Sequence, residues 1–482
     1  MRLYFDSEPY LKPSTTQKGS LQSRIFSDSL KSSPKQVYAL VYSTLKYRPY
    51  IQQVIKKSKI ETSPSIKKLR ISRELLEMLV HDLCFSARGR INSGNHPIKT
   101  AFLEHKTRLV AEFTKLKLKY KVKDVSELAV EEENDETPVR WFRINTIKCN
   151  SEDFFDKHTW FAKLQPVNSI KDITDCGMIY KDDYIPNLYG IHPKEKLTST
   201  DAYKSGEVII QDRASCFPAH ILNEINDYHD QVIDACAAPG NKTTHAASYL
   251  VKPGSIVYAF ERDAKRAQIL KKMCAIATGD KDLIHITHCD FTSTTPSDFP
   301  EVTGLVVDPS CSGSGIFGRA LQDSLNDNAG EDEVDLERLN KLAGFQFKIV
   351  KHAMSFPKAR KVVYSTCSIH ATENEQVVVD LLRDGEIKKM GWKLAPRSMV
   401  LSNWERRGWE QEFTSIAATN EECVKLAGGC VRANPKEDGG IGFFAACFIR
   451  GKNYDETQNQ DMEYEDVKEE LEEEEEEWTG FD

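Results

Sequence analysis

Hydrophobic residues recur every three or four positions in three stretches of the first part of the chain. The stretches are residues 37–45, 72–86 and 99–120, and the first of them carries Val37, Leu40, Val41 and Leu45. Such spacing places apolar side chains on one face of an α-helix. We therefore predict a helical domain over residues 35–130. The preceding residues 1–34 are rich in Ser, Lys and Pro, and we expect them to be disordered.

Short apolar runs alternate with helical patterns from residue 231 onward. The predicted strands are Gln231–Ala235, Ser255–Phe260, Leu283–His288, Gly304–Val307 and Lys361–Ser365. The predicted helices are Lys242–Tyr249, Ala264–Ala277, Leu336–Ser355 and Thr372–Arg383. This alternation predicts a doubly wound, Rossmann-like α/β sheet of parallel strands. An aromatic run at Ile441–Arg450 should add an antiparallel strand at the edge of the sheet.

The remaining segments complete the predicted domain organisation. An acidic linker at residues 131–136 follows the helical domain, and short strands and turns over residues 131–205 predict a small α/β module. The sheet domain then spans residues 206–452. Residues 453–482 cannot bury a core, so we expect an acidic, disordered tail there.

Charge is unevenly distributed along the 482 residues, which carry a net charge of −8. Residues 1–130 hold 25 Lys and Arg against 11 Asp and Glu, whereas residues 455–482 hold 15 Asp and Glu against Lys468 alone. A solvated helix surface explains isolated lysines. An excess of this size instead indicates that the helical domain contacts a polyanion such as RNA or DNA.

The cysteines and the apolar segments bear on the cellular compartment. None of the 12 cysteines forms a CxxC pair, which indicates a reducing compartment without a disulfide framework. The first residues lack the apolar core of a secretory signal. No run of about 18 apolar residues is present, so we expect no membrane association.

The first three predicted strands end in residues suited to a nucleoside ligand. The first βα turn, DACAAPGNKTTHAA (residues 234–247), lets the backbone approach a ligand near Gly240 and exposes helix N–H groups to a carboxylate. It is neither a GxGxxG fingerprint nor a P-loop. Glu261 follows the second strand, where such folds place an acid that binds ribose hydroxyls. Asp290 follows the third strand and is placed to bind an adenine amino group.

The fourth and fifth strands end in GLVVDPSCSGSG (residues 304–315) and VVYSTCSIHATENE (residues 362–375). They bring Asp308, Cys311 and Cys367 to the same edge of the sheet. A carboxyl group at a strand tip can share a proton with a ring nitrogen.

Three roles are possible for Cys367: packing, metal binding and nucleophilic attack. Packing is common for a free cysteine. Metal binding is disfavoured, because only His370 follows at ligand spacing. Thr372–Glu375 fits a capping box and predicts that the next helix starts there.

Taken together, DACAAPGNKT, DPSCSGSG and YSTCSIHATENE resemble the motifs of the NSUN-type RNA cytosine-5 methyltransferases. RINTIK (residues 143–148) and IQDRAS (residues 210–215) resemble the RNA-facing module and the lead-in strand of that family, and the resemblance covers roughly residues 138–450. Commoner members read DAPCSGTG. The Ser of DPSCSGSG and the Lys-rich helical region near PKQVYALVY resemble the eukaryotic branch that acts on large-subunit (25S/28S) rRNA.

The resemblance implies S-adenosyl-L-methionine as methyl donor and large-subunit rRNA in nucleolar pre-ribosomal particles as partner. It implies that Cys367 is the nucleophile, that Cys311 is the second cysteine, which assists product release, and that Asp308 contacts N3 of cytosine. The donor-binding residues would be Cys236, Ala237, Ala238, Pro239, Gly240, Asn241, Lys242, Glu261, Asp290 and Asp308. We expect no metal and a monomeric enzyme.

Other hypotheses stay open at this point. The same reaction on tRNA or small-subunit rRNA is possible, because the pocket reads only the base. A catalytically silent RNA-binding assembly factor for pre-ribosomes is another possibility, although such a protein has no need of both thiols. A DNA cytosine methyltransferase would carry its nucleophile in a Pro-Cys pair after the fourth strand, whereas the order here is Pro-Ser-Cys.

Overall fold

The computed structural model describes most of the chain in two compact units, one within residues 1–135 and the other starting at residue 136. The described residues are 1–12, 21–122, 124, 125, 128, 137–224, 229–250, 252–279, 281–316, 331–435 and 437–451. The predicted acidic linker (131–136) and acidic tail (453–482) lie outside them. No helix in the described part of the chain is both long and apolar enough to cross a membrane.

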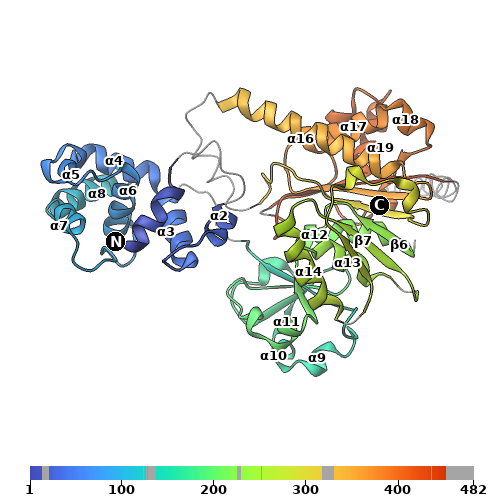
Figure 1. Cartoon of the computed structure of the whole chain (residues 1–482), viewed down its shortest axis with the longest axis horizontal. Helices are drawn as coiled ribbons and strands as arrows, with labels where there is room; N and C mark the ends of the chain where they lie inside the picture. Colours follow the sequence, from blue (N-terminus) through green and yellow to red (C-terminus); the bar gives the residue numbers. More distant parts are fainter. Residues whose placement is uncertain are drawn as a thin grey trace, which may run out of the picture. The chain divides into compact units, whose positions relative to one another are not determined.

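The first unit is helical and has one hydrophobic core (Figure 1). Its helices are α1 (Arg2–Ser7), α2 (Leu21–Ser27), α3 (Pro34–Lys46), α4 (Arg48–Ser58), α5 (Pro64–Lys68), α6 (Arg73–Val80), α7 (Pro97–Leu103) and α8 (Lys106–Tyr120). The apolar positions that define the first predicted stretch, Val37 to Leu45, and Leu75, Leu76 and Leu79 of the second are buried in this core, whereas Leu118 near the end of the third is exposed. Helix α6 starts where Ser72 caps it, because the Ser72 hydroxyl accepts the Leu75 N–H at 3.1 Å.

The N-terminus differs from the prediction of disorder over residues 1–34. Helices α1 and α2 form within the described part of this segment, and the side chains of Tyr4 and Leu11 are fully buried. The Tyr4 hydroxyl donates to Asp82 Oδ2 at 2.5 Å and accepts the Asn92 N–H at 2.9 Å. The composition is poor in apolar residues, but several of the large ones lie in the core, which orders the described part of the segment.

The second unit contains a sheet of eight strands, which confirms the predicted doubly wound α/β fold. The strand order is β11-β13-β10-β9-β6-β7-β8, with β12 paired to β13. The strands are β6 (Gln231–Asp234), β7 (Ile256–Phe260), β8 (Ile284–Thr287), β9 (Gly304–Val307), β10 (Lys361–Thr366), β11 (Lys393–Leu394), β12 (Cys430–Ala433) and β13 (Phe443–Ile449). Strands β6 to β10 are parallel, and β13 runs antiparallel to β10.

Strand β13 is antiparallel as predicted, but the prediction that it forms the sheet edge is wrong. Its outer side pairs with β11 through Leu394 and with β12 through Val431. Strands of two and four residues are too short to give a recognisable alternation in the sequence. All residues of β13 are buried, as expected for an interior strand.

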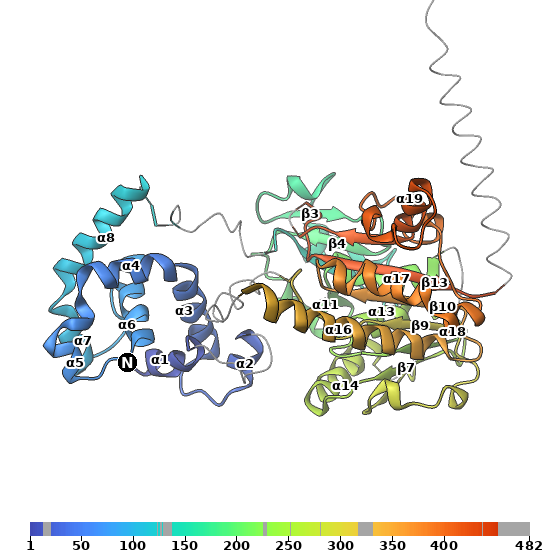
Figure 2. The same ribbon diagram turned by 90° about the horizontal axis from the view of Figure 1, so that it is seen from above.

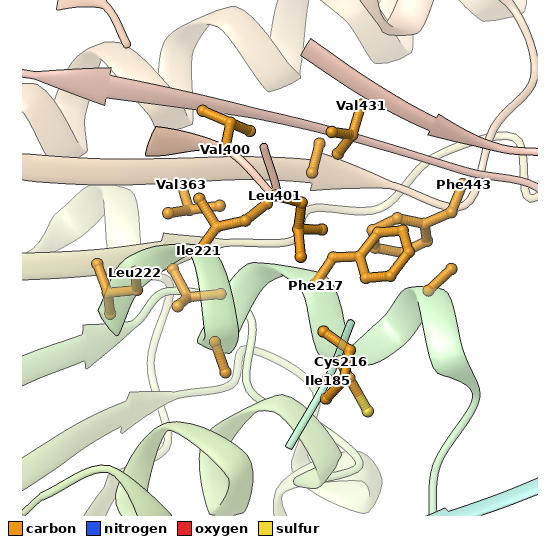
Figure 3. Close-up of a cluster of buried hydrophobic side chains, with 14 of the residues drawn as sticks. Ile185, Cys216, Phe217, Ile221, Leu222, Val363, Val400, Leu401, Val431 and Phe443 are labelled. Carbon is orange, nitrogen blue, oxygen red and sulfur yellow. The ribbon is translucent and has the colours of Figure 1, made fainter. Parts of the chain in front are cut away.

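Helices cover both faces of this sheet (Figures 1 and 2). One face carries α12 (Arg213–Asn223), α13 (Asn241–Ser248) and α14 (Ala264–Thr278), and the other carries α16 (Glu331–Met354) and α17 (Glu375–Arg383), with α18 (Gly385–Lys389) and α19 (Asn420–Gly428) nearby. Side chains of β10 alternate between the two faces. Val363 packs in the core beneath α12 and α13, whereas its neighbours Val362 and Tyr364 pack in the core beneath α16 and α17. Figure 3 shows Phe217 and Ile221 of α12 packed beneath Val363 and Phe443.

A smaller sheet precedes the large one, with strand order β2-β3-β4-β1-β5. Its strands are β1 (Arg140–Ile144), β2 (Gln165–Val167), β3 (Met178–Lys181), β4 (Leu188–Ile191) and β5 (Val208–Ile210), accompanied by α9 (Phe154–Lys157), α10 (Thr159–Ala162) and α11 (Asp201–Ser205). The buried Asn145 amide joins the small sheet to helix α14 of the large one, because it donates to the carbonyls of Gly206 and Ala277 at 2.8 Å each.

Gly206 provides a stability test of this junction. It has φ +81°, and a Cβ there would lie 2.4 Å from the Ile276 carbonyl oxygen. We predict that Gly206→Ala lowers the free energy of unfolding by at least about 2 kcal/mol, because it adds backbone strain and a clash with backbone atoms. Thermal or denaturant unfolding measures the change.

Gly344→Ala is the matched control, because Gly344 lies in α16 and a Cβ there meets no atom within 4 Å. This change should stabilise the protein by roughly 0.5–1 kcal/mol. Equal effects of the two substitutions would show that the close approach at Gly206 does not hold the sheets together.

Candidate active site

The candidate site begins where two neighbouring parallel strands end. Val307 of β9 is aligned with Tyr364 of β10, so the next residues on the two strands, Asp308 and Ser365, lie side by side. The Ser365 hydroxyl donates to Asp308 Oδ1 at 2.7 Å. The carboxyl ends of these strands therefore open onto one shared space, as the sequence predicted.

The two predicted cysteines meet just beyond these strand ends. The sulfur atoms of Cys311 and Cys367 are 3.0 Å apart, within hydrogen-bonding distance. A hydrogen bond with Cys367, followed by burial and nearby carboxylates, raises the pKa of Cys311 well above its ordinary value. Cys311 is therefore a protonated thiol at neutral pH, suited to donate a proton or a hydrogen bond.

The loop that carries Cys311 is fixed to the nucleophile loop through backbone contacts. The Gly315 N–H donates to the Cys367 carbonyl at 3.0 Å, and the Gly442 N–H donates to the Gly315 carbonyl at 2.8 Å. A Cβ on Gly315 would lie 2.2 Å from the Gly442 oxygen. Only glycine permits the backbones to approach this closely, which explains the glycine at position 315.

Asn374 holds the residues on either side of Cys367. The Thr366 hydroxyl donates to Asn374 Oδ1 at 2.6 Å, and Asn374 Nδ2 donates to the Ser368 carbonyl at 3.0 Å. All three are fully buried. Such a network fixes the loop geometry, because each polar atom left unpaired in the interior would cost free energy.

The capping box predicted at Thr372–Glu375 is absent. Residues Ala371–Glu373 form a 3₁₀ turn, and α17 begins only at Glu375. Glu373 Oε1 instead accepts the Ser312 N–H at 2.8 Å and the Gln346 amide at 3.0 Å. The Glu373 side chain therefore bonds to the Cys311 loop and does not cap the start of α17.

A buried lysine connects this cluster to the first βα turn. Lys242 Nζ lies 2.9 Å from Asp308 Oδ2 and donates to the Ser215 hydroxyl at 3.1 Å. Burial alone would lower the pKa of Lys242, but the Asp308 carboxylate outweighs it, and the net pKa is raised. Lys242 also interacts electrostatically with Cys367, so its ammonium group favours the thiolate form of that residue.

The first βα turn, between β6 and α13, has the features of a ligand-binding loop. Gly240 has φ +115°, which favours glycine, and α13 starts there without a side-chain cap, so its first N–H groups are free of intrahelical and capping partners. Ala237 and Ala238 are buried beside it. Burial raises the pKa of Cys236, so this third cysteine of the site stays protonated.

Two acids stand at the next strand tips. Glu261 follows β7 and is 6% exposed, and its Oε1 accepts the Asp263 N–H at 2.8 Å. Asp290 lies beyond β8, where Oδ1 accepts the Thr292 N–H at 2.9 Å and the Thr292 hydroxyl. The hydrogen bond from the Thr292 side chain is the main cause that lowers the pKa of Asp290, so this carboxylate is ionised and accepts hydrogen bonds.

Comparison with known proteins gives the family. Residues 219–449 match the family model described as 16S rRNA methyltransferase RsmB/F, and residues 35–129 match the N-terminal domain of NOL1/NOP2/Sun domain family member 5. The chain is 41% identical over 461 residues to the 25S rRNA (cytosine-C(5))-methyltransferase rcm1 of Schizosaccharomyces pombe, covering 95% of this chain and 93% of that protein.

The chain belongs to the NOL1/NOP2/Sun (NSUN) family of RNA cytosine-5 methyltransferases.

A second relative agrees with this membership, and a solved structure shows the same fold. A 28S rRNA (cytosine-C(5))-methyltransferase of Mus musculus is 33% identical over 462 residues, covering 94% of this chain and 92% of that protein. The crystal structure of PH0851 has a TM-score of 0.58 at 20% identity, covering 93% of this chain and 98% of that chain, and shows the same fold.

The NSUN family uses S-adenosyl-L-methionine, and the residues at this sheet edge fit it. The free N–H groups at the start of α13 suit its carboxylate, and the acids at the tips of β7 and β8 suit its ribose hydroxyls and its adenine amino group. The strand order places Glu261 and Asp290 on one side of the Gly240 turn and Cys367 on the other. A donor bound across this turn would supply a methyl group on a sulfonium beside the two thiols.

Several residues of the site were missed by the sequence prediction. Ser215, Ser365, Gln346 and Asn374 each hold a predicted residue or its loop in place. Three of them lie within the motifs quoted above, but nothing in the sequence indicated which residue each one contacts, and only their hydrogen bonds reveal their roles. Arg143 of RINTIK is also buried, and it donates to Gln211 Oε1 and to Thr244 Oγ1 at 2.7 Å, joining the small sheet to α13.

The position of Lys242 generates a test by pH. We predict that Lys242→Met moves the acidic limb of the kcat/KM profile to higher pH by at least about one unit, because loss of a nearby positive charge disfavours the Cys367 thiolate. Methyl transfer rates measured over a range of pH on short RNA would show the shift.

Lys252→Met is the control, because Lys252 forms an exposed pair with Asp230 and should leave the profile in place. A fall in rate at every pH without a shift would show that Lys242 acts only on Asp308 and not on the nucleophile.

Proposed function

We propose that this chain methylates carbon 5 of a cytosine in large-subunit rRNA, with Cys367 as the nucleophile. The observation that carries the proposal is the pair of sulfur atoms at 3.0 Å beside the Lys242–Asp308 ion pair. The relatives that match over almost the full chain are named for 25S and 28S rRNA, which favours the large subunit over tRNA or small-subunit rRNA. A silent assembly factor would have no use for two adjacent thiols at a donor-binding sheet edge.

The chemistry assigns a role to each group. The Cys367 thiolate adds to carbon 6, and the electron pair of the 5,6 double bond makes carbon 5 nucleophilic. Asp308 contacts N3 and passes to it a proton from the Lys242–Asp308 pair as sulfur attacks, which stabilises the charge that develops on the ring; the proton returns to the pair when the bond to sulfur breaks. Carbon 5 takes the methyl group and loses its proton to a base. The bond between sulfur and carbon 6 then breaks, and the electron pair returns to Cys367.

Cys311 assists that last step. Its thiol is protonated and lies against the Cys367 sulfur, so it can donate a hydrogen bond to the departing thiolate. The target base must leave its stack to reach the sheet edge, which costs a few kcal/mol and is easier in single-stranded or remodelled RNA.

The basic helical domain, residues 35–130, serves as the second RNA contact in this proposal. Its last helix, α8, has lysines exposed along its final turns and at its C-cap, namely Lys115, Lys119 and Lys121. The small sheet, whose strands run from β1 to β5, would face the RNA beside the catalytic domain. In this proposal the protein acts as a monomer on pre-ribosomal particles in the nucleolus, because large-subunit rRNA is made there.

The predicted cellular outcome concerns the two cysteines. Cells that lack the gene should lose one 5-methylcytosine of large-subunit rRNA, which bisulfite sequencing detects. The wild-type chain should restore it, whereas Cys367→Ala should restore nothing, because no covalent adduct forms. Cys311→Ala should accumulate a protein–RNA adduct that survives denaturing electrophoresis.

Cys176→Ala serves as the control, because Cys176 is exposed and its sulfur contacts His192 and neither of the two thiols. Exchange of the two phenotypes would make Cys311 the attacking residue. Loss of a methyl group from tRNA instead of rRNA would refute the proposed substrate.

The role of the basic domain is tested by salt dependence. The combined variant Lys115→Gln, Lys119→Gln and Lys121→Gln should flatten the plot of log Kd for RNA against log salt, with donor affinity unchanged. The slope should fall by roughly 0.7 for each RNA phosphate that the variant no longer neutralises. Three exposed lysines of the catalytic domain, Lys358, Lys388 and Lys389, give the matched control. Equal slopes for the two variants would reject α8 as an RNA-binding helix.

A further inference from the structure

An exposed indole lies beside the nucleophile loop. The side chain of Trp409 is 41% exposed, although it is one of the largest apolar side chains. The Arg432 guanidinium covers one face of its ring, with the guanidinium carbon 3.6 Å from a ring centroid. The solvent-accessible surface therefore lies on the opposite face and the edge of the indole.

A buried ion pair fixes the position of the indole. Arg432 is 8% exposed, and its Nε and Nη2 donate to the two carboxylate oxygens of Glu375 at 2.6 Å each. Glu375 Oε1 also accepts the backbone N–H of Trp409 at 3.0 Å. Because a two-point Arg–carboxylate contact fixes direction as well as distance, the guanidinium presents one fixed plane to the ring above it.

The backbone before the indole is equally constrained. The Gly408 N–H donates to the carbonyls of Ala427 and Cys430 at 3.1 Å each, and a Cβ on Gly408 would lie 3.0 Å from Cys430 Cβ. The loop that presents Trp409 is thus fastened to β12 and to the end of α19.

The same arginine touches the nucleophile loop. Arg432 Nη1 donates to the Ile369 carbonyl at 3.1 Å, and Ile369 follows Cys367 by two residues. The Ile369 side chain is 43% exposed and packs against Gly442, at the backbone contact that fixes the Cys311 loop. One buried ion pair, Arg432–Glu375, therefore contacts both the flat aromatic surface and the loop that carries the attacking sulfur.

An exposed aromatic face beside a site that must receive an extruded base has a specific use. Once a cytosine leaves its stack, its neighbours lose a stacking partner, and an aromatic side chain can replace it. Any base offers a π-face, so such a contact holds the strand without reading its sequence. A free indole on a mobile loop would lose entropy on binding, whereas this one is already ordered.

We propose that Trp409 is a stacking platform for a nucleotide adjacent to the target cytosine, and that Arg432 and Glu375 are positioning residues for it. The inference rests on the proposed methylation of RNA and extends it to the recognition of the flanking strand. The proposed occupant of the platform is an RNA base and not a protein, so the contact should operate on RNA free of protein.

The test uses the full-length protein and a short single-stranded RNA from the large-subunit target region. Trp409→Ala should raise KM for the RNA by about tenfold or more, with kcat and donor affinity nearly unchanged. Trp409→Phe should recover most of this loss, because it keeps a π-face, whereas Trp409→Leu should not. Val424→Ala, at an exposed apolar position of α19, should have no effect.

A second arm separates stacking from a structural role. It uses a set of RNAs in which one nucleotide next to the target cytosine is made abasic, each RNA at a different position. For one of these RNAs, KM should rise with the wild-type protein, but no further rise should be seen with Trp409→Ala. The proposal would be overturned if the abasic nucleotide and Trp409→Ala had additive effects on KM at every position. It would also be overturned if Trp409→Ala had a normal KM, or if its defect appeared only with pre-ribosomal particles. Failure of the wild type to methylate any of these RNAs would instead refute the proposed function.

Discussion

The site depends on the pairing of two parallel strands, β9 and β10. Because Val307 and Tyr364 are aligned, the chain leaves both strands at the same level of the sheet and delivers Asp308, Cys311 and Cys367 to one space. Thiols 56 residues apart in the chain are thereby brought to 3.0 Å. The neighbouring strand β6 contributes Lys242 through its following helix, which adds a cation to the same space.

Buried polar residues, not the hydrophobic core, fix the loops beyond these strands. Three consecutive residues illustrate this, because Glu373 holds the Cys311 loop, Asn374 holds the Cys367 loop and Glu375 holds Arg432. Burying such groups costs desolvation free energy, so they contribute less to stability than to a single geometry. That single geometry is what covalent catalysis requires, since reacting atoms must be held within a fraction of an ångström.

The sequence predicted the architecture well where a physical rule connects pattern to structure. Alternating strands and helices imply a parallel sheet, and parallel strands end at a common edge, so the approach of Asp308, Cys311 and Cys367 followed from the order of the elements. The rule failed where local and tertiary signals compete. Thr372–Glu375 has the letters of a capping box, yet Glu373 is directed to Ser312, a residue 61 positions away. The burial of Tyr4 could not be foreseen for a related reason, since its partners Asp82 and Asn92 are distant in the chain. Nothing in the sequence near Trp409 indicates that Arg432 lies beneath it.

The central claim is that the Cys367 sulfur, with Cys311 as its protonated neighbour, forms the bond to cytosine. An RNA that carries 5-fluorocytosine at the target position traps this bond, because fluorine cannot leave carbon 5 as a proton does. Mass spectrometry of the digested complex should find the methylated nucleotide attached to the peptide that contains Cys367. Attachment to the peptide that contains Cys311, or the absence of any adduct under conditions that methylate normal RNA, would contradict this account.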